Sequence, residues 1–119
     1  MRVVTVRIGL GNFLRARMVE SFPEAARGLS SEYYLGDDQG MVFPSSVVGQ
    51  YPTLVFDQTN IPLDVLWISG GRISGVERNV QPHSAGGVRP VNPIDYALEL
   101  RGGYVSDRGI ALGDPVLLS

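Results

Sequence analysis

The stretch Thr59–Ile68, TNIPLDVLWI, is the longest apolar run in the chain and holds the only tryptophan, Trp67. Apolar residues fall on both faces that a strand would have here, which is typical of a strand at the centre of a sheet. One carboxylate, Asp64, interrupts the run. A buried carboxylate needs a partner, because burying it alone costs several kcal/mol. We therefore predict a central strand in which Asp64 accepts hydrogen bonds from backbone N–H groups or pairs with an arginine. The alternative is an acid in a functional cleft.

Short runs of alternating apolar and polar residues surround this stretch. The chain has 15 Gly and 8 Pro, and they fall between the runs, as in a β-rich domain. The pair Gly70-Gly71 is typical of a hairpin turn into a returning strand over residues 72–80. With no βαβ alternation, the runs predict a mainly β fold, a compact, jelly-roll-like β-sandwich or barrel. The other expected strands lie within residues 2–8, 13–19, 41–43, 53–57, 95–100 and 110–118.

One short helix is predicted near residues 23–28. Ser21 is a good N-terminal cap, Glu24 follows three positions later, and Gly28 offers a C-terminal cap. We expect no other helix. The segment Gln81–Pro93 is rich in Pro and Gly and has no periodicity, so we expect a loop there that is functional or mobile.

Length and composition limit the class of protein. The 119 residues correspond to a single domain, 1–119. There is no cysteine, and the net charge is −2 with ten basic residues, all arginine; this balance argues against a nucleic-acid partner. No apolar run reaches about 18 residues, so we expect no membrane span. The N-terminus lacks the features of a signal peptide, so we expect a soluble, cytoplasmic protein.

Polar residues in or beside the expected strands are the candidates for chemistry. Glu99 shares a strand face with Arg101, and we expect this face to be solvated; the alternative is a carboxylate within a site. His83 is the only histidine, and no nucleophile motif or cysteine accompanies it. The pair Asp37-Asp38 lacks the spaced ligands of a calcium loop. We therefore predict no catalytic residue, no metal site and no cofactor.

Six segments in a fixed order carry a family resemblance: Arg27–Leu29, Asp38–Phe43, Thr59–Ile68, Val80–Pro82, Tyr96–Gly103 and Gly113–Val116. In this order they resemble domain of unknown function 192, a small and mostly bacterial and archaeal domain. The resemblance runs from about Ala16 to Val116 and rests on the ordered set, not on any single motif. It implies a compact β-sandwich or barrel with one short helix. It implies no activity, because the family's biochemical function is not established, and similar proteins are often exported.

One departure from the family pattern falls just before the central stretch. Family members usually have an aromatic-Met-Lys/Arg-Asn-Thr segment there. The matching residues here are 55–59, VFDQT, so Asp57 replaces the base and Gln58 lengthens the amide. If this segment lines a ligand site, its charge is inverted in this chain. The run Arg89–Pro93 offers a replacement positive group.

Three functions are open at this point, and an enzyme is not the favoured one. The first is a non-enzymatic binding or accessory module that recognises a small polar ligand, a sugar or a peptide at its loop ends. The second is a structural component of an assembly, possible as a homo-oligomer paired through strand edges. The third is a small carboxylate-dependent hydrolase that uses Asp64 and Glu99 as a pair. The candidate ligand-binding residues are Arg27, Asp38, Asp57, Thr59, Asp64 and Glu99, with the Gln81–Pro93 loop.

Overall fold

A curled sheet of seven strands forms a half-barrel in the computed structural model, which describes residues 1–119. The strands are β1 (Arg2–Ile8), β2 (Asn12–Met18), β3 (Gln39–Pro44), β4 (Leu54–Phe56), β5 (Leu63–Ser69), β6 (Arg72–Val80), β7 (Ser84–Val88), β8 (Tyr96–Arg101) and β9 (Val116–Leu118). The order in the large sheet is β6-β5-β8-β3-β2-β1-β9, and β4 pairs with β7 in a second, two-stranded sheet. The predicted mainly β fold is confirmed.

Both predicted hairpins form. β1 and β2 pair antiparallel over their full lengths, from Arg2 opposite Met18 to Ile8 opposite Asn12. β5 and β6 are joined by Gly70 and Gly71, whose φ angles are 59° and 71°. A two-residue turn with positive φ at both positions matches the right-handed twist of a hairpin, and glycine adopts it without steric cost.

β5 is a central strand, as predicted from its two-sided apolar pattern. It lies between β6 and β8. Every residue from Leu63 to Ile68 is buried, including Asp64 and Trp67. The strand therefore has a covering layer on each face of the sheet.

Three short helices complete the chain: α1 (Phe22–Arg27), α2 (Ser45–Val48) and α3 (Tyr104–Asp107). α1 is the predicted helix, and the Ser21 hydroxyl accepts a hydrogen bond from the Glu24 N–H at its start. The expectation of a single helix was wrong, because α2 and α3 are one turn each and too short to give a helical period. None of the three is long and apolar enough to cross a membrane.

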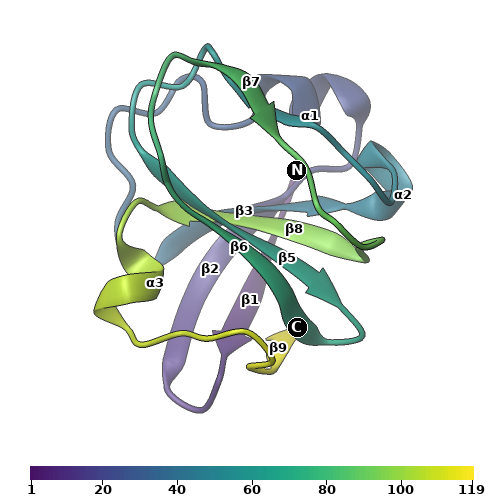
Figure 1. Cartoon of the computed structure of the whole chain (residues 1–119), viewed down its shortest axis with the longest axis vertical. Coiled ribbons are helices and arrows are strands. Elements are labelled where there is room, and N and C mark those ends of the chain that lie inside the picture. The colour runs from purple at the N-terminus through teal and green to yellow at the C-terminus, as the bar shows by residue number, and fades with distance from the viewer.

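Two apolar clusters cover opposite faces of the sheet. Along β5, Val65 and Trp67 face one cluster, and Leu66 and Ile68 face the other. We call the cluster with Trp67 the α1-side core, because Ala25 of α1 packs against it. We call the other the α3-side core, since it contains Tyr104 and Val105 of α3. In Figure 1, α1, α2 and β7 accordingly lie on one side of the large sheet, and α3 lies on the other.

The segment Gln81–Pro93 is not the structureless loop that we expected. Its middle forms β7, which pairs antiparallel with β4 and places Val88 opposite Leu54. The sequence of β7, SAGGV, has low β propensity, because glycine lacks a side chain to pack. The pairing therefore depends on tertiary contacts that a local pattern does not contain.

One pair of neighbouring strands is parallel. β2 pairs with β3 from Arg15 opposite Gln39 to Met18 opposite Val42, and α1 lies in the connection between them. A parallel pair needs such a crossover, because a tight turn joins only antiparallel strands. This β2–α1–β3 unit was not predicted, and it departs from the antiparallel pattern of a jelly roll.

Candidate functional site

A cavity of about 340 Å³ opens on the α1 side of the large sheet. α1 and the turn after it form one wall, and the chain around β4 forms another. β3, α2 and β8 supply single residues. The lining residues are Phe22, Ala25, Ala26, Arg27, Gly28, Leu29, Ser30, Phe43, Val48, Pro52, Thr53, Leu54, Val55, Asp57, Gln58, Thr59 and Glu99.

Glu99 is the buried acid of this cavity. It lies on β8 opposite Met41 of β3 and Val65 of β5, two residues of the α1-side core. Only 4% of its surface is exposed, and no hydrogen bond or ion pair contributes to its titration. Burial alone raises the pKa of the Glu99 carboxyl to about 8, because an apolar environment disfavours the charged form.

The prediction that Glu99 lies on a solvated face of its strand was wrong. Alternation along β8 does turn the Glu99 side chain to the face of the strand away from Leu98 and Leu100. However, β8 is an inner strand, with a hydrogen-bonded strand on each side. The covering layer of α1 and β4 then shields the face that Glu99 shares with Ala97. Alternation within one strand does not show whether another layer covers a face of the sheet. It therefore predicted exposure to solvent for a side chain that lines a cavity.

Two oppositely charged side chains lie at the solvent-facing part of the cavity. Arg27, the last residue of α1, and Asp57, just after β4, both line it and are both exposed. Neither side chain takes part in an ion pair within the chain. The positive group at the cavity is thus Arg27, and the expected replacement by Arg89 was wrong, because Arg89 is not a lining residue.

Thr59 holds the turn that carries Asp57 and Gln58. Its hydroxyl donates to the Phe56 carbonyl oxygen at 3.0 Å, and its own N–H donates to the same oxygen at 3.2 Å. The backbone N–H of His83 also donates to that oxygen, at 2.8 Å. The family segment over residues 55–59 therefore lines the cavity with all but one of its residues, since Phe56 alone is absent from the lining.

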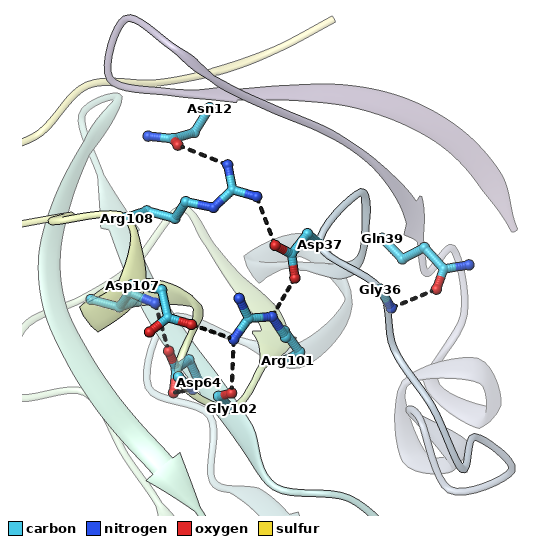
Figure 2. A network of polar contacts seen from close by, with 11 residues as sticks. Asn12, Gly36, Asp37, Gln39, Asp64, Arg101, Gly102, Asp107 and Arg108 are labelled. Carbon is cyan, nitrogen blue, oxygen red and sulfur yellow. Dashed lines mark hydrogen bonds and ion pairs between the residues drawn. The ribbon is translucent and has the colours of Figure 1, made fainter.

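Asp64 is a structural fastener, as the first prediction for it stated. Its carboxylate accepts three backbone hydrogen bonds, from the N–H groups of Asn79 at 2.8 Å, Gly103 at 3.1 Å and Val105 at 2.9 Å. Asp64 is 1% exposed. It thereby ties the end of β6 and the start of α3 to the central strand, and Figure 2 shows it beside Gly102 below the arginine network.

Asp64 and Glu99 lie on opposite faces of the sheet. Asp64 is paired with Leu100, a residue of the α3-side core, whereas Glu99 is paired with Val65 of the α1-side core. Side chains of adjacent strands share a face only when their residues are directly paired or two apart. The acid pair that a hydrolase would need does not form between these two residues.

Asp38 also lies away from the cavity. It borders a second hollow of about 350 Å³ with residues of β1, β2 and β3, among them Arg15 and Arg17. Of the six predicted ligand-binding residues, the structure gathers Arg27, Asp57, Thr59 and Glu99 around one cavity. It places Asp38 and Asp64 elsewhere.

The neighbouring Asp37 anchors a polar network that the sequence analysis did not predict. Arg101 donates to one of its carboxylate oxygens, and Arg108 donates to the other at 2.8 Å (Figure 2). Arg101 also pairs with Asp107 at 3.0 Å. The hydrogen bonds from Arg101 and Arg108 hold the pKa of the Asp37 carboxyl well below its usual range. This network joins the turn before β3 to β8 and α3.

The fold and the cavity define a small half-barrel β domain in which a buried acid, Glu99, lines a pocket beneath a short helix. The profile of DUF192, described as "Uncharacterized ACR", matches residues 4–118. The chain therefore belongs to this family, and the resemblance seen in the six segments is confirmed. The family has no established biochemical function.

Solved structures share the whole fold. A crystal structure from Sinorhizobium meliloti 1021, of a protein provisionally described as a transcription regulator, has a TM-score of 0.91 at 25% identity, over 98% of this chain and 94% of that chain. A protein of unknown function from Novosphingobium aromaticivorans DSM 12444 has a TM-score of 0.89 at 27% identity, over 97% of this chain and 84% of that chain. No curated protein matches the chain.

A third structure shows the fold alone. It is a provisionally described exported protein from Burkholderia pseudomallei K96243, with a TM-score of 0.53 at 17% identity. The match covers 98% of this chain and 24% of that chain. The same fold therefore also occurs within a much longer chain.

Proposed function

We propose that this protein is a non-enzymatic binding module that takes a small ligand with a polar group into the cavity beside α1. One observation carries the proposal: the Glu99 carboxyl is buried, faces a cavity and has no partner within the chain. Buried polar groups in proteins nearly always have a hydrogen-bond partner, in the protein or in ordered water. A ligand in the cavity would supply the partner that the chain does not.

The size and lining of the cavity support this proposal. Ligand sites have volumes of about 300–1,000 Å³ and apolar walls with a few polar groups that fix the orientation of the ligand. The cavity of about 340 Å³ is at the small end of that range and suits a small molecule or the end of a peptide. Phe43, Leu29 and Leu54 provide apolar wall, and Glu99, Arg27 and Asp57 provide the polar groups.

The separation of Asp64 from Glu99 is why binding is favoured over hydrolysis. Acid-pair hydrolysis needs two carboxyl groups about 5–9.5 Å apart in one cleft, with one of them free to act as nucleophile or base. Asp64 faces the opposite core and already accepts three backbone hydrogen bonds. Asp64 is therefore not available as a nucleophile or base at the cavity.

The proposal is tested by a ligand screen with a blocked cavity as the comparison. Ala26 is an exposed residue of α1 that lines the cavity, so Ala26→Trp should fill its opening. Ala111 is exposed and lies outside the lining, so Ala111→Trp is the matched control. Saturation-transfer NMR with small polar compounds, sugars and dipeptides should find binders to the wild type and to Ala111→Trp that Ala26→Trp does not bind.

Two results would contradict the proposal. One is a screen in which no compound binds the folded wild-type protein. The other is a set of binders that Ala26→Trp retains at full affinity, because those compounds would then occupy some other surface.

A further inference from the structure

We propose that the ligand of the Glu99 cavity is a small organic cation, with an ammonium or guanidinium group that donates hydrogen bonds to Glu99 and an apolar stem against the walls. This inference rests on the proposed function, because it names the class of ligand for the same cavity. It follows from the contrast between Glu99 and the other buried acid, Asp64.

Hydrogen-bond donors satisfy the other buried carboxylate, Asp64, and also the exposed carboxylate of Asp37. Asp64 has three backbone N–H donors, and Asp37 has two arginines. Glu99 has no donor of either kind, although it is one of the three buried polar or charged residues. An ionised carboxylate only accepts hydrogen bonds, so the partner that the ionised form of Glu99 lacks is a donor.

The net charge of the cavity lining is one that a single positive group would neutralise. Its lining contains three ionisable side chains, Arg27, Asp57 and Glu99. Arg27 is exposed and makes no ion pair with Glu99, so it does not neutralise the buried acid. The strand residues directly opposite Glu99 are Met41 and Val65, which carry no charge. With Glu99 ionised, the three groups sum to one negative charge, and a single ligand cation balances it.

The walls suit the rest of such a ligand. Phe22, Leu29, Phe43 and Leu54 line the cavity, and burial of an apolar stem against them contributes about 25 cal/mol per Å² of apolar surface. Aromatic faces also attract cations, because the ring carries negative charge density above and below its plane. A heavily hydroxylated sugar would leave its own groups without partners on such walls.

The cation and the Glu99 proton are mutually exclusive, so binding is linked to pH. Burial raises the pKa of the Glu99 carboxyl to about 8, and the carboxyl is mainly protonated at neutral pH. A bound cation favours the carboxylate, and the complex forms with release of that proton. Affinity should therefore rise with pH, by up to about tenfold per unit, and level off above about pH 8.

The test uses benzylammonium as the cationic probe and benzyl alcohol as its neutral counterpart of similar shape. Both are titrated into ¹⁵N-labelled protein at pH 6, 7 and 8, where benzylammonium keeps its charge. We expect benzylammonium to shift the amide signals of Arg27, Thr59 and Glu99 and to bind at least about tenfold more tightly at pH 8 than at pH 6. We expect benzyl alcohol to bind more weakly and without this rise.

Glu99→Gln provides the matched variant, because glutamine keeps the shape and cannot ionise. We expect it to bind benzylammonium at least about tenfold more weakly at pH 8 and to lose the pH dependence. Calorimetry of the wild type in two buffers of different ionisation enthalpy should show release of up to one proton. This second measurement decides the question if Glu99→Gln does not fold.

Failure of this inference and failure of the proposed function give different results. Equal binding of benzyl alcohol and benzylammonium, or a pH-independent affinity without proton release, overturns the cation while the cavity remains a binding site blocked by Ala26→Trp. Lack of binding by any cationic probe, with other compounds still bound in the cavity, also overturns it. The proposed function fails only if nothing binds there.

Discussion

Two buried acids on adjacent strands have opposite environments. Asp64 has three backbone donors within 3.1 Å, and Glu99 has none. The difference arises from the pairing register, which turns Asp64 toward α3 and Glu99 toward α1. One acid can therefore hold the fold together while the other remains available to a ligand.

At Asp64 we expect a large loss of stability on truncation. Asp64→Ala leaves three backbone N–H groups without their acceptor, that of Val105 fully buried and those of Asn79 and Gly103 partly buried, and breaking such a network costs about 2–4 kcal/mol in the free energy of unfolding. Urea denaturation followed by circular dichroism measures this loss. Asp38→Ala is the control, since Asp38 is exposed and its side chain makes no hydrogen bond or ion pair. Equal stability of the two variants would contradict the fastening role.

At Glu99 we expect a pH-dependent stability of defined sign. The folded-state pKa is raised from the usual 4.5 to about 8, so the folded protein holds a proton that the unfolded chain releases between these values. The contribution of Glu99 to the free energy of unfolding should be largest below about pH 4.5. It should fall as the pH rises toward 8, by at most about 1.4 kcal/mol per unit.

Glu99→Gln separates this effect from other titrations. The pKa of the Met1 amino group is also raised, by its hydrogen bond with Glu24, and its contribution is lost as the pH rises above about 8. That group is common to both proteins, so the difference between wild type and variant isolates Glu99. Thermal melts at pH 5, 6.5 and 8 should show a flatter profile for the variant, and parallel profiles would refute the raised pKa.

Elements with a strong local signal were predictable from the sequence, and those without one were not. The β1–β2 hairpin follows from strict alternation, and α1 follows from Ser21 and Gly28 at its ends. β7 and α3 have no such signal, because contacts with distant residues stabilise them. Asp64, for example, accepts hydrogen bonds from the first turn of α3 across about 40 positions of sequence.

Within β7 we expect two adjacent glycines to respond differently to substitution. Both have positive φ, 93° at Gly86 and 71° at Gly87. A Cβ on Gly86 would meet nothing within 4 Å, whereas one on Gly87 would lie 2.6 Å from the Leu54 carbonyl oxygen of β4. Gly86→Ala should cost about 1–2 kcal/mol for the left-handed backbone alone. Gly87→Ala should cost about 1–3 kcal/mol more, because β4 must move.

The same pair of variants tests whether β7 supports the cavity. Leu54 is a lining residue, so a shift of β4 should weaken ligand binding in Gly87→Ala and leave it intact in Gly86→Ala. Chemical denaturation gives the stabilities, and the benzylammonium titration gives the affinities. Equal effects of the two substitutions on both measurements would show that β7 is a mobile loop, as its sequence suggested.

Across the whole molecule, the site depends on a layer that covers a sheet. Arg27 and Thr59 were predictable as candidate residues because they lie in segments shared with the DUF192 family, and Asp57 because it lies where the chain departs from the family pattern. Their meeting with Glu99 was not predictable, since it requires α1 and β4 to cover the face of β8. The misplacement of Asp38 has a similar cause: adjacent residues in a turn point in different directions, and only the folded chain shows that Asp37 faces the arginines.

The two cores share the strands β3, β5 and β8, and this sharing predicts how the molecule unfolds. Trp67 lies in the α1-side core and is 2% exposed, so its fluorescence reports on that core alone, whereas far-ultraviolet circular dichroism reports on the whole sheet. Loss of either core exposes one face of β5, and the strand cannot remain in place with one face unpacked. We therefore expect the two signals to follow one urea transition with the same midpoint, as in a two-state domain. An earlier transition in fluorescence would mean that the layer of α1 and β4 detaches first, and the cavity would then open without unfolding of the sheet.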